Sequence, residues 1–242
     1  MENAVIIPVY NEATTLPGVL ARVRRFHSGL IIAVDDGSTD GSGEILRDFK
    51  GLDIVRHETN MGYGQSLNDG FARALELSTP LAVTMDCDEQ HEPALIPAMF
   101  EKIGALDVLS GSRYLREDPG QDQAPPQRLR INRSITAIIN TITGYGLTDS
   151  FCGFKCHRME AMARLRLDEP GYAWPIQFWV QARHFGLRVE EIAVPRIYKD
   201  RSRTFGGGID DPEKRYDYYM TVLERETRKW PMSSSLAPIR TT

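Results

Sequence analysis

The sequence predicts an α/β protein in which helices cover both faces of a mostly parallel sheet. Short apolar runs alternate with segments of helical spacing along the first half of the chain, and the connections between them are short. The chain has 242 residues, of which 41% are hydrophobic and 26% charged, as in ordinary soluble globular proteins. In folds of this class, ligands bind outside the carboxyl ends of the strands.

Strands and helices follow from two different periods in the sequence. The expected strands are apolar runs at residues 4–9, 30–34, 53–55, 81–85, 108–109 and 188–194. The expected helices carry apolar residues three and four positions apart and lie at residues 16–26, 42–49, 65–77, 94–103, 129–143, 175–185 and 210–230. The polar, proline-rich residues 116–128 predict a mobile loop, and residues 231–242 predict a flexible tail.

Polar clusters directly follow three of the expected strands. These clusters read PVYNE at 8–12, DDGSTDG at 35–41 and DCDEQH at 86–91. Because the carboxyl ends of parallel strands meet at one edge of a sheet, we expect the three clusters to lie together there. That edge is therefore the predicted binding site.

Asp86 and Asp88 lie one residue apart at the end of the fourth expected strand. In extended backbone their side chains point the same way, and carboxylates that close repel unless a cation or a shared proton lies between them. Hard oxygen ligands suit Mg²⁺ or Mn²⁺, and Gln90 offers one more oxygen. Two alternatives stay open. In one, Asp88 caps the next helix and Asp86 is solvated; in the other, the chain is a phosphatase of the haloacid dehalogenase type, although Gln90 replaces its threonine.

The cluster at 35–41 offers carboxylates at a glycine-rich turn. Carboxylates accept hydrogen bonds from the N–H groups of a base or the hydroxyls of a ribose, whereas they oppose an anion at a helix start. Asp40 fits a plain helix cap equally well. Neither the dinucleotide fingerprint nor the P-loop motif occurs in the chain, which excludes both of those phosphate cradles.

Charge and cysteine content narrow the class of protein. A net charge of −4 gives no bulk electrostatic reason to expect a nucleic-acid partner. Cys87, Cys152 and Cys156 are too few for a disulfide framework and fit a reducing compartment. We find neither a signal-peptide pattern nor an apolar run of about 20 residues. We therefore expect a cytoplasmic protein that meets a membrane only at its surface; the oligomeric state is not readable.

Six motifs together resemble family 2 glycosyltransferases in their order and approximate spacing. They read VIIPVYNEATTL, AVDDGSTDGS, NMGYGQSLNDGFARA, TMDCDEQHEP, VLSGSRY and DSFCGFKCHRMEA, and the resemblance covers residues 4–205. Within that family the chain looks most like the polyprenyl-phosphate (dolichol-phosphate) mannosyltransferase and glucosyltransferase group. It departs from that group in having Gly62-Tyr63-Gly64 where a Gly-Lys-Gly is familiar, and DRSRTFGGG near its end.

The resemblance implies a GT-A fold and a metal-dependent transfer from a nucleotide-diphosphate sugar, a GDP- or UDP-sugar, with inversion at the anomeric carbon. It implies one catalytic domain over residues 1–230, with a nucleotide-binding half at 1–112 and an acceptor half at 113–230. A polyprenyl phosphate is the favoured acceptor. A soluble molecule or a protein is the alternative acceptor, and a non-catalytic sugar-nucleotide-binding protein is the alternative of another class.

Matched motif positions imply a role for each site residue. The nucleotide sugar would be bound by Pro8, Tyr10, Glu12, Val34, Asp36, Asp86, Cys87, Asp88, Arg113, Arg133 and Arg203. The metal would be held by Asp86, Asp88 and Gln90, with Mg²⁺ or Mn²⁺ as the cofactor. The expected catalytic residues are Asp88, Arg113 and Asp149. Asp149 is the candidate base or acceptor-positioning group, because a hydroxyl acceptor needs a base whereas a phosphate is already ionised.

Overall fold

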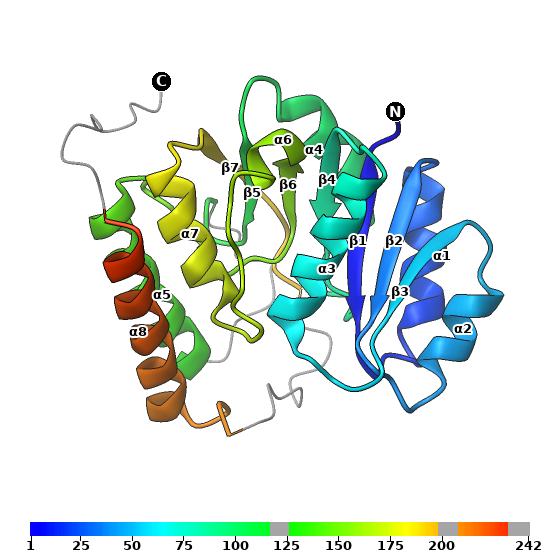
Figure 1. Ribbon diagram of the computed structural model, residues 1–242, viewed down its shortest axis with the longest axis horizontal. Helices are drawn as coiled ribbons and strands as arrows, with labels where there is room; N and C mark the ends of the chain where they lie inside the picture. The colour runs from blue at the N-terminus through cyan, green and yellow to red at the C-terminus, as the bar shows by residue number, and fades with distance from the viewer. Residues whose placement is uncertain (117–125, 198–207, 232–242) are drawn as a thin grey trace.

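The computed structural model describes residues 1–116, 126–197 and 208–231, and its centre is a seven-stranded sheet (Figure 1). The strand order is β3-β2-β1-β4-β6-β5-β7. The strands are β1 (Ala4–Val9), β2 (Leu30–Asp35), β3 (Leu52–Arg56), β4 (Leu81–Thr84), β5 (Val108–Ser112), β6 (Lys155–Arg158) and β7 (Val189–Ala193). All neighbouring strands pair in parallel except β6, which runs antiparallel to both β4 and β5. The expected mostly parallel sheet is confirmed.

Helices cover both faces of this sheet (Figure 1). They are α1 (Leu16–Phe26), α2 (Ser42–Asp48), α3 (Tyr63–Glu76), η1 (Pro93–Leu95), α4 (Ile96–Lys102), α5 (Pro126–Thr143), α6 (Met159–Met162), α7 (Trp174–His184) and α8 (Pro212–Lys229). Apolar side chains form two cores, one with α3, α5, α7 and α8 and the other with α1, α2 and α4. Successive side chains of β1 point to opposite faces of the sheet, so the strand contributes to both cores. Ile6 packs in the first core, and Val5 and Ile7 pack in the second.

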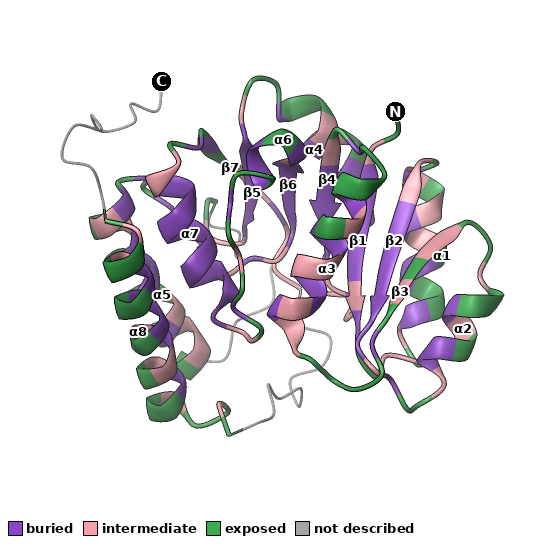
Figure 2. Cartoon of the chain, in the orientation of Figure 1, coloured by how far each residue is buried: buried purple, intermediate pink, exposed green. Residues whose placement is uncertain are grey.

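Figure 2 shows that burial is greatest in the sheet, which lies between the two layers of helices. The strands in the middle of the sheet are buried on both faces, and every residue from Trp174 to Arg183 of α7 is buried. By contrast, the edge strand β3 is only partly buried. A helix that is buried all round needs no amphipathic stripe, which is why α7 reads as a continuous apolar segment with few polar interruptions.

Most of the expected elements occur within one to three residues of their predicted ends. The expected α1 is confirmed at 16–26, whereas α3 begins at Tyr63, two residues earlier than expected. The pattern missed β6 and the short α6, because Lys155 and His157 break the apolar run that marks a buried strand. Of the predicted loop at 116–128, residues 126–128 belong to α5 and residues 117–125 lie outside the described residues, as does the predicted tail from residue 232.

Within the described part of the chain, the helices are too short or too polar to cross a lipid bilayer.

Candidate functional site

A cavity of about 620 Å³ opens at the carboxyl ends of the parallel strands. The loops after β1, β2 and β4 and the first turn of α3 form one side of it, and β6, α5, α7 and α8 contribute to the other. The predicted site residues that line it are Pro8, Tyr10, Glu12, Asp36, Asp86, Cys87, Asp88, Gln90 and Arg113. The three polar clusters therefore meet in one cavity, as the strand-end rule predicts.

Three predicted site residues within the described part of the chain do not line this cavity. The Val34 side chain is 0% exposed and packs in the core beneath α3, and Asp149 is buried behind Arg113. Arg133 is exposed on α5, one position beyond the cavity-lining Asn132, so the helical turn carries its side chain elsewhere. A side-chain contact of Val34 or Arg133 with the nucleotide is therefore not supported by the geometry, and Arg203 lies outside the described residues.

Asp86 and Asp88 both line the cavity, and each carboxylate has a different hydrogen-bond partner. The Tyr63 hydroxyl donates to Asp86 Oδ1 at 2.9 Å, and Asp88 Oδ1 accepts the backbone N–H of Gln90 at 3.0 Å. Burial raises the pKa of Asp86, and the Tyr63 hydrogen bond and the Lys155 charge oppose that rise. The next helical turn is capped by Glu92 and not by Asp88, because Glu92 accepts the Ala94 N–H at 3.1 Å.

His91 supports the Asp86 loop from below. Its Nδ1 accepts the backbone N–H of Asp86 at 3.0 Å, and its ring stacks on Phe154 with centroids 5.2 Å apart. Burial lowers the pKa of His91 to about 4, so the imidazole is neutral and can accept at Nδ1. His91 is thus a buried support for the loop.

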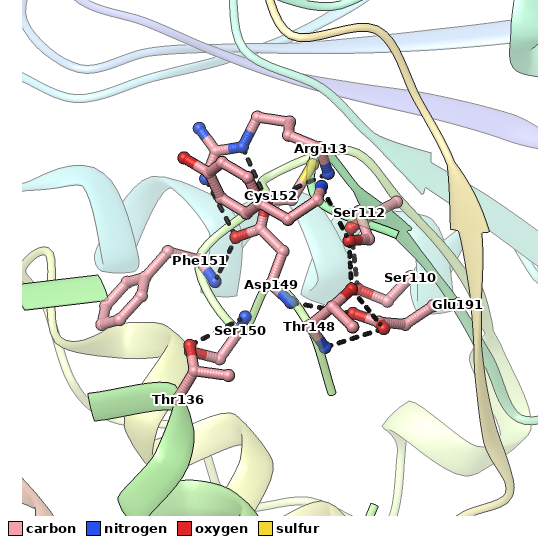
Figure 3. Close-up of polar contacts among 12 residues, drawn as sticks. Ser110, Ser112, Arg113, Thr136, Thr148, Asp149, Ser150, Phe151, Cys152 and Glu191 are labelled. Atoms are coloured by element: carbon pink, nitrogen blue, oxygen red, sulfur yellow. Dashed lines mark hydrogen bonds and ion pairs between the residues drawn. The ribbon is translucent and has the colours of Figure 1, made fainter. Parts of the chain in front are cut away.

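A bidentate ion pair joins Arg113 to Asp149 (Figure 3). Arg113 Nε lies 2.7 Å from Asp149 Oδ2, and Nη2 lies 3.0 Å from Oδ1. Burial alone would raise the pKa of Asp149, but the charge and hydrogen bonds of Arg113 outweigh it and hold that pKa below its ordinary value. Asp149 is therefore an ionised carboxylate whose oxygens are turned toward Arg113.

Glu191 of β7 holds the segment that carries Asp149 (Figure 3). Its carboxylate accepts the backbone N–H of Thr148 at 2.8 Å and the backbone N–H of Asp149 at 3.0 Å. The Thr148 hydroxyl donates to the same carboxylate at 2.8 Å and also bonds to Ser112 at the end of β5. Because β5 and β7 are paired strands, the orientation of Arg113 is fixed from the sheet.

Lys155 is a second cation at the bottom of the cavity. It begins β6, is 2% exposed, and its ammonium donates to the Cys152 carbonyl. Burial lowers its pKa, whereas the nearby charges of Asp149 and Asp86 act to raise it. A buried cation on the cavity lining is the kind of group that can stabilise negative charge developing in the cavity.

Asp36 lines the cavity, but its carboxylate oxygens bond to the neighbouring loop. Its Oδ1 accepts the Met61 N–H at 2.7 Å and lies 2.7 Å from His57 Nδ1, and its Oδ2 accepts the Gly62 N–H at 2.9 Å. Asp40 likewise bonds across loops, accepting the Ala13 N–H at 2.9 Å and the Ser42 hydroxyl. These carboxylates tie the polar clusters to one another and so shape the cavity wall.

The charged residues that line the cavity form two sets, which we call its acidic end and its basic end. These names refer to charge and not to separation, because the charges of Lys155 and Arg113 lie close enough to Asp86 to act against the rise in its pKa. The lining residues before position 113 include Glu12, Asp36, Asp86 and Asp88 and no Lys or Arg. From position 113 onward, the described lining residues include Arg113, Arg128, Lys155 and Arg215 and no Asp or Glu. The first end suits a cation and hydroxyl or N–H donors, and the second suits an anion.

Sequence reasoning missed most of the second end. The lining residues that it did not single out there are Arg128, Asn132, Phe151, Cys152, Gly153, Lys155, Tyr172, Pro175, Arg215 and Tyr219, together with Tyr63 at the start of α3. Lys155 lies in the matched motif DSFCGFKCHRMEA, so the resemblance could have flagged it. Arg128 and Arg215 carry no local signal, because a single Arg on an amphipathic helix is usually solvated. Of the aromatic residues of α7, Trp174 lines the cavity, whereas Phe178 and Trp179 are core residues with 0% exposure.

The chain belongs to glycosyl transferase family 2, whose family model matches residues 4–166, well over half of its length. This membership confirms the resemblance carried by the six motifs.

Characterised relatives cover nearly the same length. The chain is 27% identical to the undecaprenyl-phosphate mannosyltransferase of Micrococcus luteus, with 86% of this chain and 89% of the relative aligned. It is 29% identical to the polyprenol monophosphomannose synthase of Mycolicibacterium smegmatis (78% and 75% aligned). It is 26% identical to the UDP-N-acetylglucosamine–dolichyl-phosphate N-acetylglucosaminyltransferase of Methanococcus voltae (84% and 89% aligned).

Solved structures agree with the fold. The glucosyl-3-phosphoglycerate synthase of Mycobacterium tuberculosis, crystallised with Mn²⁺, UDP and glucosyl-3-phosphoglycerate, superposes with a TM-score of 0.70. The alignment covers 97% of this chain and 81% of that one at 17% identity. At that identity the likeness establishes the fold, which is the expected GT-A arrangement of a mostly parallel sheet flanked by helices.

Proposed function

We propose that this chain transfers a hexose from a nucleotide-diphosphate sugar to a polyprenyl phosphate, with inversion at the anomeric carbon. The division of the cavity into an acidic and a basic end carries the proposal. The names of the three relatives, each a transferase or synthase that acts on a polyprenyl or dolichyl phosphate or forms a polyprenol monophosphomannose, favour the same class of acceptor.

The acidic end fits a divalent cation on the donor diphosphate. Asp86 and Asp88 offer two carboxylates on one wall, and Gln90 offers an amide oxygen beside them. Among the described residues no third His, Cys, Asp or Glu completes a protein-only ligand set. That donor set suits Mg²⁺ or Mn²⁺, which commonly keep waters and substrate phosphate oxygens in their shells. The ion, when bound, would neutralise charge on the departing diphosphate.

Arg113 and Lys155 act on the same leaving group. Asp149 holds the Arg113 guanidinium in one orientation, which removes much of the entropy cost of binding a phosphate oxygen. Lys155 supplies a compact ammonium from the cavity floor. Positive groups that are already in place before the bond breaks stabilise the charge that develops on the leaving oxygen.

The basic end fits an acceptor that is already ionised. A hydroxyl acceptor needs a free carboxylate within hydrogen-bond reach. Of the described carboxylates in the cavity, Asp86 and Asp88 are proposed to bind the cation. Glu12 accepts the Thr15 hydroxyl, and Asp36 accepts N–H groups of the neighbouring loop. Asp149 does not supply a free carboxylate, because it is 1% exposed and both of its oxygens bind Arg113. An ionised phosphate attacks without a base, and Arg128 and Arg215 can neutralise it. The acceptor is therefore proposed to be the phosphate of a lipid met at the membrane surface.

Two measurements test this function. Thermal unfolding with Mn²⁺ and a panel of UDP- and GDP-sugars should show one donor raising the unfolding temperature, because a ligand stabilises the state that it binds. That donor, with polyprenyl phosphate in detergent micelles, should give the glycosyl lipid. Asp88→Ala should abolish transfer, whereas Cys87→Ala should retain it, because Cys87 is buried and its carbonyl accepts the Thr15 hydroxyl at 2.7 Å.

The other candidate functions give different results in the same assays. Transfer to a soluble molecule or a protein, but not to the lipid, would contradict the polyprenyl-phosphate acceptor and favour the alternative acceptor. Binding of the nucleotide sugar without any turnover would indicate a sugar-nucleotide-binding protein. Full activity in EDTA would contradict the metal assignment. Release of phosphate from a simple phosphomonoester would favour the phosphatase interpretation of the two aspartates.

A further inference from the structure

The phenol of Tyr63 contacts one oxygen of the Asp86 carboxylate. Its hydroxyl donates to Asp86 Oδ1 at 2.9 Å. Gly153 faces this hydrogen bond and leaves it just enough room, since a Cβ there would lie 2.8 Å from Asp86 Oδ2 and 2.9 Å from the Tyr63 hydroxyl. Asp86 is therefore held by a hydrogen-bond donor beside a backbone segment that tolerates no larger residue.

Tyr63 is itself held in place by the turn that precedes α7. Its ring stacks on Tyr172 with centroids 5.5 Å apart and an interplanar angle of 9°. The first turn of α3 lies against the backbone of residues 169–171, where Gln65 N–H donates to the Pro170 carbonyl at 3.1 Å. A Cβ at Gly64 would lie 2.2 Å from the Glu169 carbonyl, so this contact is a close one between two backbones.

Side chains of α8 hold the turn at residues 169–172 in place. Glu169 is 3% exposed, and its Oε2 lies 3.0 Å from Arg225 Nη2. The Tyr218 hydroxyl donates to Glu169 Oε1. The position of the Tyr63 ring thus depends on a packed assembly of α3, the 169–172 turn and α8, and not on its own rotamer preference alone.

A tyrosine phenol carries its proton at neutral pH, so Tyr63 is the donor in the 2.9 Å hydrogen bond to Asp86 Oδ1. A neutral donor that bonds to one carboxylate oxygen leaves the other oxygen charged and orients it. Such outer contacts commonly change metal affinity or activity by about 10–100-fold when they are removed.

We propose that Tyr63 is a positioning residue that fixes the Asp86 carboxylate for the divalent cation. This inference rests on the proposed function, because Asp86 is a metal ligand only there. In this proposal Tyr63 is not a metal ligand and acts through Asp86. Its removal should therefore weaken cation binding while leaving the binding of the bare nucleotide unchanged.

The test is Mn²⁺ binding to Tyr63→Phe, measured by electron paramagnetic resonance with UDP and, separately, GDP, in the absence of a sugar donor or acceptor. The expected result is about 10–100-fold weaker retention of Mn²⁺ than in the unaltered protein. Nucleotide affinity in EDTA should not change. Tyr145→Phe is the matched control, because it removes a buried phenol hydrogen bond of 3.0 Å to the Leu187 carbonyl outside the cavity.

The outcomes separate this inference from the proposed function. Equal Mn²⁺ affinity in Tyr63→Phe and the unaltered protein overturns the positioning role but leaves the transferase proposal standing. An equal loss in Tyr145→Phe also overturns it, because the effect would then be one of general stability. If the unaltered protein binds no Mn²⁺ with either nucleotide, the metal assignment fails, and the inference fails with it.

Discussion

Arg113 and Asp149 form a two-point contact across 36 residues of sequence, with Nε 2.7 Å from Oδ2 and Nη2 3.0 Å from Oδ1. The Arg113 backbone N–H adds a third bond to Oδ2 at 3.2 Å. The guanidinium reaches the cavity, whereas the carboxylate is almost entirely buried. This relationship shows Asp149 as the partner that orients Arg113, which is neither of the two roles expected from the sequence, a base or an acceptor-positioning group. The proposed function makes that arginine a catalytic one.

Asp149→Asn should lower kcat by about 10–100-fold, because an amide cannot accept both guanidinium bonds and leaves Arg113 poorly aligned. The free energy of unfolding should fall by about 3–5 kcal/mol, the usual effect of removing one partner of a buried ion pair. Steady-state kinetics and urea denaturation measure the two effects.

Asp107→Asn is the matched control for this variant. Asp107 makes the same bidentate contact with Arg188, at 3.1 Å for both bonds, and neither residue lines the cavity. That variant should lose stability and keep kcat. A normal kcat in Asp149→Asn would contradict the orienting role of Asp149. An equal loss of kcat in Asp107→Asn would contradict it as well.

Arg215→Gln should raise the KM for polyprenyl phosphate by about 10–100-fold and leave the KM for the nucleotide sugar unchanged. Arg215 is 4% exposed and lines the basic end of the cavity, and a hydrogen bond to a charged group contributes about 1.5–3 kcal/mol. Arg133→Gln, on the exposed side of α5, should change neither constant. A rise in the KM for the nucleotide sugar in Arg215→Gln would show that this arginine binds the donor, and it would contradict its assignment to the acceptor phosphate.

Stability should fall as the pH drops from about 6.5 toward 4, because His91 and His157 are buried in neutral form. Burial lowers the pKa of His91 to about 4 and that of His157 to about 3. Since both folded values lie below the unfolded value, the unfolded state takes up protons first, and each histidine costs about 2 kcal/mol at pH 5. Denaturation curves at pH 7 and pH 5 measure the loss.

His157→Leu should flatten this pH dependence by about 2 kcal/mol at pH 5. Its buried Nδ1 has no hydrogen-bond partner among the described residues, and its ring contacts the Phe71 and Phe178 rings edge-on, so an apolar side chain suits the site. An unchanged slope, or imidazole NMR resonances that titrate near pH 6.5, would show that the histidine is not neutral in the folded protein.

Gly64→Ala should destabilise the protein by about 1–3 kcal/mol and reduce activity. The new Cβ would lie 2.2 Å from the Glu169 carbonyl and 2.8 Å from the Gly171 carbonyl, so the turn against which Tyr63 packs must move. Gly18→Ala in α1 is the control, since its Cβ would meet only Glu89 Oε1 at 4.0 Å, and it should stabilise by about 0.5–1 kcal/mol. Equal stability of the two variants would contradict the close backbone contact.

The acidic end of the cavity was predictable from the sequence because local rules place its residues. Strands feed short loops, and the loops after β1, β2 and β4 must meet at one sheet edge. The basic end was not predictable in this way. Lys155 lies on an antiparallel strand that carries no apolar pattern, and Arg128 and Arg215 come from α5 and α8, which pack beside one another only in the folded chain.

By itself, the sequence determined the α/β class, the order of most strands and helices, and the family, because periodicity and motif order are local properties of the chain. Only the tertiary structure decided which side chains face the cavity. It turned Val34 into the core and Arg133 toward solvent, and it paired Asp149 with Arg113. Side-chain direction and ion pairing between distant segments depend on packing, and packing is settled only when the segments meet.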